Sequence, residues 1–168
     1  MEVFYLICFA CVGCGRIHQS ANSILSEPLK LTRRIDKEVE VNHSPADVLK
    51  LIFAYENYSR FIPGCISSTK KEISDSQTQG KLVFSFLNKD YIFESLNEEI
   101  EGGLKMDQIS GPFKSFRSFW QVTSANNKTL IQFSAEFETN YILEFLATDK
   151  RIDTLADKII SAFLGQLR

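Results

Sequence analysis

The chain holds few of the side chains that usually carry catalysis. It contains only two histidines, His18 and His43, and His43 stands just before a predicted helix, where a solvated turn residue is expected. No Ser–His–Asp or Cys–His arrangement can be proposed from the other residues, and no P-loop or dinucleotide-binding fingerprint occurs. The sequence therefore predicts a protein that is not an enzyme and that needs no catalytic cofactor.

Acidic residues are the other candidates for proton transfer. They gather in the middle of the chain, at Glu94, Glu98, Glu99, Glu101 and Asp107. Two carboxyl groups held close together can act as general acid and base. These residues lie on alternating predicted strands, where such positions are typical of the wet face of a sheet. We therefore interpret them as surface residues.

A cysteine cluster near the N-terminus suggests metal binding. Cys8, Cys11 and Cys14 stand three residues apart and His18 follows, a spacing that suits a tetrahedral metal or an iron–sulfur cluster. A lipid attached to Cys14 is a second hypothesis. No fourth cysteine is nearby and the surroundings are an apolar run without turn residues. We favour a targeting or anchoring leader and expect no metal site.

The N-terminal stretch shows no pattern that fits a domain. Residues 3–14 form an almost unbroken apolar run, which is shorter than the roughly 20 residues that span a bilayer. Glu2 is the only charge before it, so the basic start of a secretory signal is missing. We divide the chain into a leader, 1–28, and one domain, 29–168. In that domain Cys65 has no cysteine partner, which is consistent with a reducing compartment.

Composition predicts a globular domain with a large aromatic interior. The 168 residues suit one domain, and 14 of them are Phe, which brings apolar surface without a polar handle. Such residues can fill a core or line a cavity. The net charge of −2 argues against binding nucleic acid through the general field of the protein, so no DNA partner is expected.

The spacing of apolar residues predicts a strand, a helix, several strands and a final helix. Alternation over 35–41 indicates a half-buried strand, and Ser44 caps a helix that we expect to end near Tyr58. Strands follow within 65–101, 104–108, 116–122 and 131–137, with tight turns at 102–103 and 126–127. A terminal helix carries an apolar stripe at Ile152, Leu155, Ile159, Phe163 and Leu167. This order predicts an α+β domain in which the last helix covers an antiparallel sheet.

Two short motifs resemble a known family. One is the run from Tyr58 to Cys65, YSRFIPGC, and the other is Gly111-Pro112-Phe113-Lys114, followed by Trp120. Together with the strand Phe133–Phe137 and the last helix, they resemble the coenzyme Q-binding proteins of the START-like, polyketide cyclase/lipid-transport superfamily. The bacterial ribosome-association toxin belongs to the same group. The resemblance covers residues 31–164.

The resemblance implies a helix-grip fold, with a curved antiparallel sheet around a long C-terminal helix and a deep apolar tunnel between them. It implies ubiquinone (coenzyme Q) or a related isoprenoid lipid as the ligand. The protein would be a non-catalytic carrier or chaperone that supports respiratory electron transport and quinone biosynthesis. Our predicted ligand-binding residues are Phe61, Pro63, Phe84, Phe86, Tyr91, Phe93, Pro112, Phe113, Trp120, Phe133, Phe137, Phe145, Ile159 and Phe163.

Physical reasoning assigns roles within this set. Phenylalanine and leucine side chains suit an isoprenoid tail, while Trp120 and Tyr91 each carry a donor that could orient the quinone ring. Phe61 and Phe113 flank proline-containing loops and are expected at the rim of the pocket. For each aromatic residue, simple core packing is the alternative.

Partners and location follow from the same resemblance. We expect peripheral membrane contact through a second apolar cluster around Phe145 and Leu146. The expected location is the matrix side of the mitochondrial inner membrane if the source is eukaryotic, and the cytoplasm or inner membrane if it is bacterial. The alternative function is inhibition of ribosomal subunit joining, which the acidic balance disfavours because RNA contact needs a basic face. A cyclase-like enzyme is a third hypothesis, disfavoured by the missing acid/base set.

Overall fold

The computed structural model describes residues 32–86, 88–139 and 149–167. Their helices and strands follow the predicted order. The elements are β1 (Thr32–Val41), α1 (Pro45–Phe53), a 3-10 helix η1 (Tyr55–Arg60), β2 (Cys65–Glu72), β3 (Gln77–Phe86), β4 (Lys89–Ile100), β5 (Gly103–Ser110), β6 (Phe113–Ala125), β7 (Lys128–Thr139) and α3 (Asp149–Gln166).

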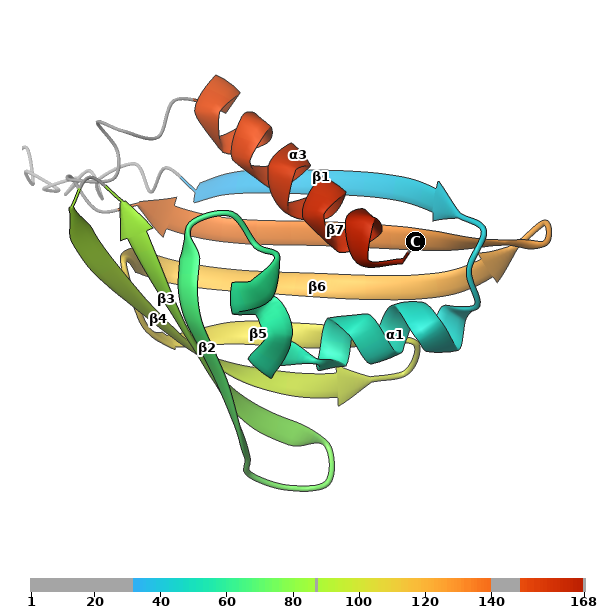
Figure 1. Ribbon diagram of the computed structural model, residues 1–168, viewed down its shortest axis with the longest axis horizontal. Helices are drawn as coiled ribbons and strands as arrows, with labels where there is room; N and C mark the ends of the chain where they lie inside the picture. Colours follow the sequence, from blue (N-terminus) through green and yellow to red (C-terminus); the bar gives the residue numbers. More distant parts are fainter. Residues whose placement is uncertain (1–31, 87, 140–148, 168) are drawn as a thin grey trace, which may run out of the picture.

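All seven strands form one antiparallel sheet with the order β1-β7-β6-β5-β4-β3-β2. Strands β2 to β7 are a meander, and β1 closes the other side by pairing with β7. Figure 1 shows the sheet curving around α1, η1 and α3, which lie on the same side of it. The apolar inner face needs such a cover, because a sheet with one apolar face is stable only when another layer shields that face from water.

Strand residues alternate between the two faces as predicted. On β6, Ser118, Trp120 and Val122 are buried, while Arg117 and Phe119 are exposed. The turns also agree with the sequence. The φ angles of Asn126 and Asn127 are +50° and +66°, and that of Gly102 is +67°, in the left-handed region that suits these residue types.

The first helix begins as predicted and ends earlier. The Ser44 side chain accepts a hydrogen bond from the Asp47 backbone N–H (3.1 Å), and Pro45 opens the helix. The α-helix stops at Phe53. The chain then tightens into η1, which places the rings of Tyr55 and Tyr58 in the interior. The predicted single helix to Tyr58 is therefore two elements, because apolar spacing does not separate an α-helix from a 3-10 helix.

The predicted stripe on the last helix is wrong at one position. Leu155 is 52% exposed, whereas Ala156 and Ile160 are buried. The inward line runs through Ile152, which is half-buried, and Ala156, Ile160 and Phe163, which are buried, in steps of four and three that keep one face of a helix on the sheet. The prediction followed large apolar residues only, and it therefore passed over the small residue Ala156.

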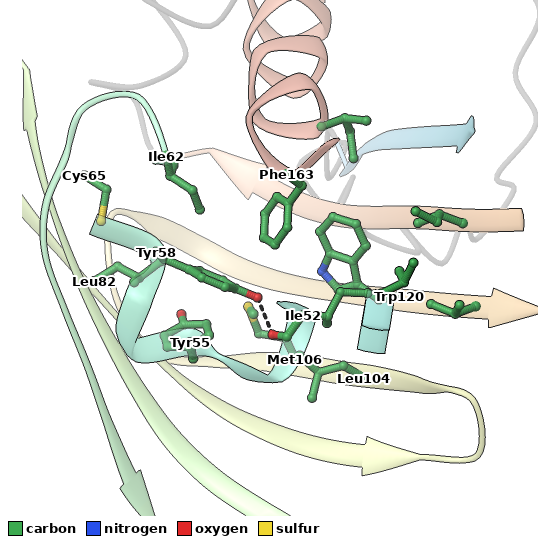
Figure 2. Close-up of a cluster of buried hydrophobic side chains, with 14 of the residues drawn as sticks. Ile52, Tyr55, Tyr58, Ile62, Cys65, Leu82, Leu104, Met106, Trp120 and Phe163 are labelled. Carbon is green, nitrogen blue, oxygen red and sulfur yellow. Dashed lines mark hydrogen bonds between the residues drawn. The ribbon is translucent and has the colours of Figure 1, made fainter. Parts of the chain in front are cut away.

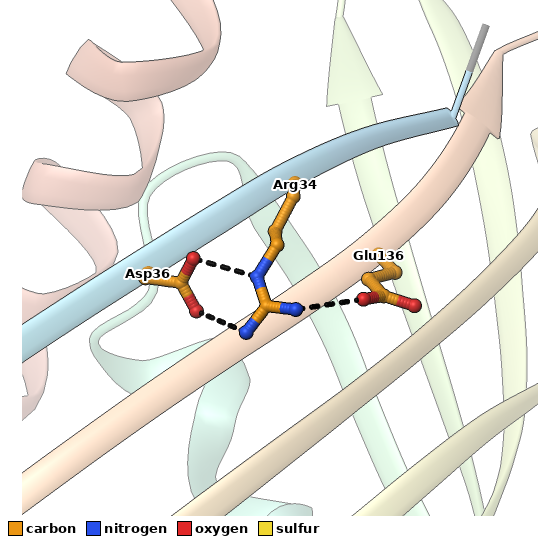
Figure 3. Close-up of polar contacts among 3 residues, drawn as sticks. All are labelled: Arg34, Asp36 and Glu136. Atoms are coloured by element: carbon orange, nitrogen blue, oxygen red, sulfur yellow. Dashed lines mark hydrogen bonds and ion pairs between the residues drawn. The ribbon is translucent and has the colours of Figure 1, made fainter.

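Ion pairs cover the outer side of the sheet. Arg34 donates to both carboxylate oxygens of Asp36 and to Glu136 of β7 at 3.0 Å (Figure 3). The predicted surface acids behave in the same way. Lys81 pairs with Glu94, and Lys105 pairs with Glu98 and Asp107, which also receives Arg117.

Two predicted features lie outside the described residues. They are the leader, 1–28, and the apolar cluster that includes Phe145 and Leu146. In the part of the chain that the structure describes, no helix has both the length and the apolar character needed to cross a membrane.

Candidate functional site

The site that the fold creates is the interior between the sheet and α3. Strands β1, β6 and β7 and the last helix enclose a small cavity of about 10 Å³, which has room for roughly one water molecule. Its lining is apolar except for one amine, and consists of Lys37, Val39, Trp120, Ile131, Phe133, Ile160, Phe163 and Leu164. A cavity of this size does not hold a lipid, so the predicted tunnel stays a prediction.

Aromatic rings fill the centre of this interior. The Phe163 ring lies 5.0 Å from both Tyr58 and Trp120 and 5.1 Å from Phe61, measured between ring centroids. Phe133 lies 4.6 Å from Trp120 on the neighbouring strand. Figure 2 shows Phe163 reaching down from α3 between Tyr58, Ile62 and Trp120. Four predicted ligand-binding residues, 61, 120, 133 and 163, are thus brought together.

A second aromatic group lies at the end of the sheet where β6 begins. Phe93 contacts Phe113 and Phe116 at 6.4 and 5.2 Å, and Phe137 lies 5.3 Å from Phe113. Phe113 and Phe116 are partly buried, while Phe93 and Phe137 are buried. Three more predicted residues therefore face the same interior. Phe116, the first residue of the predicted strand 116–122, joins this group although it was not among the predicted ligand-binding residues.

The other predicted residues are more scattered. Phe84 and Ile159 are partly buried against the core, and Tyr91 is the β4 residue that pairs with Phe84. Pro63 is exposed and Pro112 is half-buried. Phe86 is the last residue of β3, and Phe145 lies outside the described residues.

The Gly-Pro-Phe motif has a structural explanation that involves an unpredicted residue. Gln108 donates from Nε2 to the carbonyl of Phe113 at 3.0 Å and so ties the turn between β5 and β6. A Cβ on Gly111 would lie 2.5 Å from Gln108 Oε1 and 3.2 Å from the Phe93 ring. The glycine therefore permits the turn to fold tightly over the amide. The sequence did offer one signal for Gln108, because a side-chain amide stands at an inward position of the strand just before this motif.

The other motif, from Tyr58 to Cys65, secures η1 and the start of β2. The Tyr58 hydroxyl donates to the Ile52 carbonyl inside the core, and Gly64 adopts a φ of +78°. Cys65 is buried and its Sγ donates to the Ser67 carbonyl at 3.3 Å. Burial raises the pKa of this thiol, which keeps it protonated and unreactive.

A buried chain of polar groups runs from η1 to β4. The Tyr55 hydroxyl lies 3.2 Å from Ser95 Oγ, and Ser95 donates to Asn97 Oδ1 at 2.9 Å. All three residues are at most 1% exposed. Gly80 makes room for them, because a Cβ there would stand 2.2 Å from the Tyr55 ring. Sequence reasoning missed this chain, although Gly80 inside a strand marks a close approach.

The charged edge of the interior lies between β1 and α3. Lys37 lines the cavity with its stem and places its amine 2.7 Å from Asp157 and 3.7 Å from Asp153. The hydrogen bond that Lys37 donates to Asp157 is the main cause that raises the pKa of Lys37. This amine stays charged at neutral pH and joins the last helix to the first strand.

The ionisable groups described in the interior are in their ordinary protonation states at neutral pH. Burial raises the pKa of Tyr55 and of Tyr58, so both remain protonated phenols. Within residues 32–86, 88–139 and 149–167, no group of three or more His, Cys, Asp or Glu side chains could hold a metal ion. The arrangement offers apolar contact, a few hydroxyls and amides, and one charged rim.

Comparison with known proteins identifies the family. Residues 41–164 match the family model described as polyketide cyclase/dehydrase and lipid transport. No curated protein matches the chain.

Solved structures share the fold at low sequence identity. The Zhui aromatase/cyclase from Streptomyces sp. R1128 is 13% identical with a TM-score of 0.67, over 80% of this chain and 93% of that one. A START superfamily protein from Mycobacterium smegmatis is 16% identical with a TM-score of 0.62, over 80% and 93%. A STAR-related lipid transfer protein fragment from Xanthomonas axonopodis is 13% identical with a TM-score of 0.63, over 80% and 85%. The predicted START-like superfamily is confirmed. Its coenzyme Q-binding branch stays a prediction.

Proposed function

Because the chain belongs to the polyketide cyclase/dehydrase and lipid transport family, we propose that it binds an isoprenoid quinone and carries it without changing it. The family suggests hydrophobic ligand binding or lipid transport. The quinone is the finer step, and it rests on the two motifs at 58–65 and 111–114 together with the interior they help to shape. This carrier would support respiratory electron transport and quinone biosynthesis.

The observation that carries the proposal is the aromatic inner face. Phe61, Trp120 and Phe163 meet in the middle, and the group around Phe113 extends the same face to the end of the sheet. An isoprenoid tail that packs along these rings would gain about 25 cal/mol of binding free energy for each Å² of apolar surface removed from water. Since the rings leave only a small cavity, the ligand must displace side chains as it enters.

A carrier rather than an enzyme is supported by what is buried. The buried polar residues in the described ranges are Ser95, Asn97, Ser118, Thr129 and Thr139. These side chains can position a ligand through hydrogen bonds, but they do not exchange protons near neutral pH. Aromatase/cyclases share the fold, so an assay for turnover of a polyketide-like substrate is the matching check.

We further propose that the carrier works at a membrane surface. An isoprenoid quinone dissolves in the bilayer, so loading and unloading require peripheral contact there. The matrix side of the mitochondrial inner membrane, or the bacterial cytoplasm and inner membrane, is the corresponding location.

The direct test is to purify the protein, extract it with organic solvent and identify the lipid by mass spectrometry. The Phe61→Ala/Phe113→Ala double variant should retain less quinone than the wild type. The loss in quinone retention should be larger than the loss in the free energy of unfolding. Phe119→Ala is the matched control, since Phe119 lies on the outer face and is 38% exposed. Absence of any quinone in the wild-type extract, with no binding of added quinone, would contradict the proposal.

Binding to ribosomal subunits is the competing outcome. Several basic residues on the outer face, among them Arg34, Lys105 and Arg117, are paired with carboxylates, which lowers the positive charge that these residues offer to RNA. Co-sedimentation with subunits by lipid-free protein would favour the toxin-like function.

A further inference from the structure

Two buried polar atoms on the inner face have no hydrogen-bond partner among the described residues. They are Asn97 Nδ2 and Gln108 Oε1. Burying such an atom unpaired is costly, so an orphan inside a folded protein calls for an explanation. In a fold that binds apolar ligands, one explanation is that the partner arrives with the ligand.

The neighbouring hydrogen bonds fix what each orphan can do. Gln108 uses its amide nitrogen on the Phe113 carbonyl. A carbonyl only accepts, so the other atom of the Gln108 amide must be oxygen, an acceptor. Asn97 accepts from Ser95 through Oδ1, so its free atom is a donor.

The two amides lie on the same face of adjoining strands but in different surroundings, since Asn97 belongs to the buried polar chain under η1 and Gln108 faces the aromatic group at Phe93 and Phe113. Gln108 pairs with Ser95 across β4 and β5, and Asn97 is two residues further along β4 on the same face. The Gln108 amide packs beside the Phe93 ring and the Phe113 backbone. A polar point of this kind, surrounded by rings, is how apolar pockets fix the orientation of a ligand.

We propose that Gln108 recognises a hydroxyl group on the polar end of the ligand. A hydroxyl can donate a hydrogen bond, and it can therefore pair with the orphan acceptor, Gln108 Oε1. The inference rests on the proposed function and sharpens it. A quinone ring has only acceptor oxygens and leaves Gln108 Oε1 unpaired, whereas the hydroquinone has two O–H donors. The protein should prefer the reduced form.

The experiment compares binding of a short-tailed ubiquinone and of its hydroquinone under anaerobic conditions. We expect the hydroquinone to bind about tenfold more tightly, the size of effect that one added hydrogen bond to a buried acceptor supplies. By linkage, this preference raises the two-electron reduction potential of the bound ligand by about 30 mV. A potentiometric titration measures that shift independently.

Two variants locate the effect. Gln108→Met keeps the length of the side chain and removes the acceptor together with the bond to the Phe113 carbonyl. Losing that bond should weaken both ligands alike, whereas losing the acceptor should bring the ratio of the two affinities to about one. Gln132→Met is the control, because the Gln132 amide lies on the outer face and donates to Glu38; it should keep the wild-type ratio. An unchanged ratio in a folded Gln108→Met would overturn the assignment.

A second ligand pair separates this inference from the proposed function. Geranylgeraniol carries a hydroxyl on an isoprenoid tail, and its methyl ether lacks the donor. Tighter binding of the alcohol by the wild-type protein supports hydroxyl recognition even if no quinone binds. Equal binding within both pairs refutes the inference while leaving lipid carriage intact. Neither readout needs the variant to fold.

Discussion

The two covers on the inner side of the sheet are built differently. Under α1 and η1, the Tyr55 and Tyr58 hydroxyls are hydrogen-bonded, their rings are at most 3% exposed, and Gly80 lies directly against one of them. Under α3, apolar side chains make the contacts of the interior, Lys37 pairs with Asp157 only at the edge, and a small cavity remains. Directional bonds permit one arrangement, whereas apolar contacts permit several of similar energy. The first region therefore suits a fixed support, and the second suits the entry of a ligand.

The sharpest way to break the fixed region is Gly80→Ala. The added methyl would overlap the Tyr55 ring, which has no room to move, and we expect the free energy of unfolding to fall by about 3 kcal/mol, the upper part of the usual range for overpacking. Chemical denaturation measures this. The same change at Gly165, where nothing lies within 4 Å of the new atom, should be neutral or slightly stabilising. Similar effects at both sites would contradict the close packing.

In the region under α3, even the removal of most of a side chain should lower the free energy of unfolding less than Gly80→Ala does. Ile160→Ala removes a buried side chain beside the cavity, and we expect a loss of about 2 kcal/mol, the low end for such truncations because the helix can settle. Leu155→Ala on the exposed side of α3 should change the free energy of unfolding by less than about 0.5 kcal/mol. The pair tests the corrected stripe, and a greater effect at Leu155 would restore the predicted one.

Removing one hydroxyl probes the polar chain. Tyr55→Phe keeps the ring over Gly80 and deletes the bond to Ser95, so a loss of about 1 kcal/mol is expected. Thermal and denaturant unfolding should agree on this value. A loss above about 3 kcal/mol would show that the chain matters far more than a single hydrogen bond.

The smallest effect should come from the charged edge. Lys37→Met removes the contacts to Asp153 and Asp157, whose side chains are 65% and 63% exposed, and should cost less than about 1 kcal/mol. The pKa of Lys37 is raised above 10.5 in the folded protein. The stabilisation is therefore full below pH 10.5 and disappears as pH rises through the higher folded value. A wild-type advantage over the variant that persists undiminished at pH 12 would speak against the pair.

Much of the fold followed from alternation and turn chemistry, and the interior followed only in part. Trp120 and Phe163 face inward because their strand and helix have clear periodicity. Gln108 and Asn97 escaped notice, since polar residues at inward positions break the pattern that finds a core. The exposure of Leu155 was missed for the opposite reason, as a large apolar residue drew the stripe away from Ala156. The spacing of apolar residues shows which face of a strand or helix points inward. The role of a polar residue on that face depends on its hydrogen-bond partners, which only the structure shows.

The pairing of β1 with β7 sets an order of events for folding. Every other neighbouring pair of strands in the sheet is consecutive in the chain, but Glu40 and Lys128, which form an ion pair across β1 and β7, are 88 residues apart. Local hairpins can form before this pairing, which must wait for a long loop to close. During synthesis the first strand leaves the ribosome well before its partner exists. Its alternating charges, from Arg34 through Glu40, keep that waiting strand from pairing with other chains.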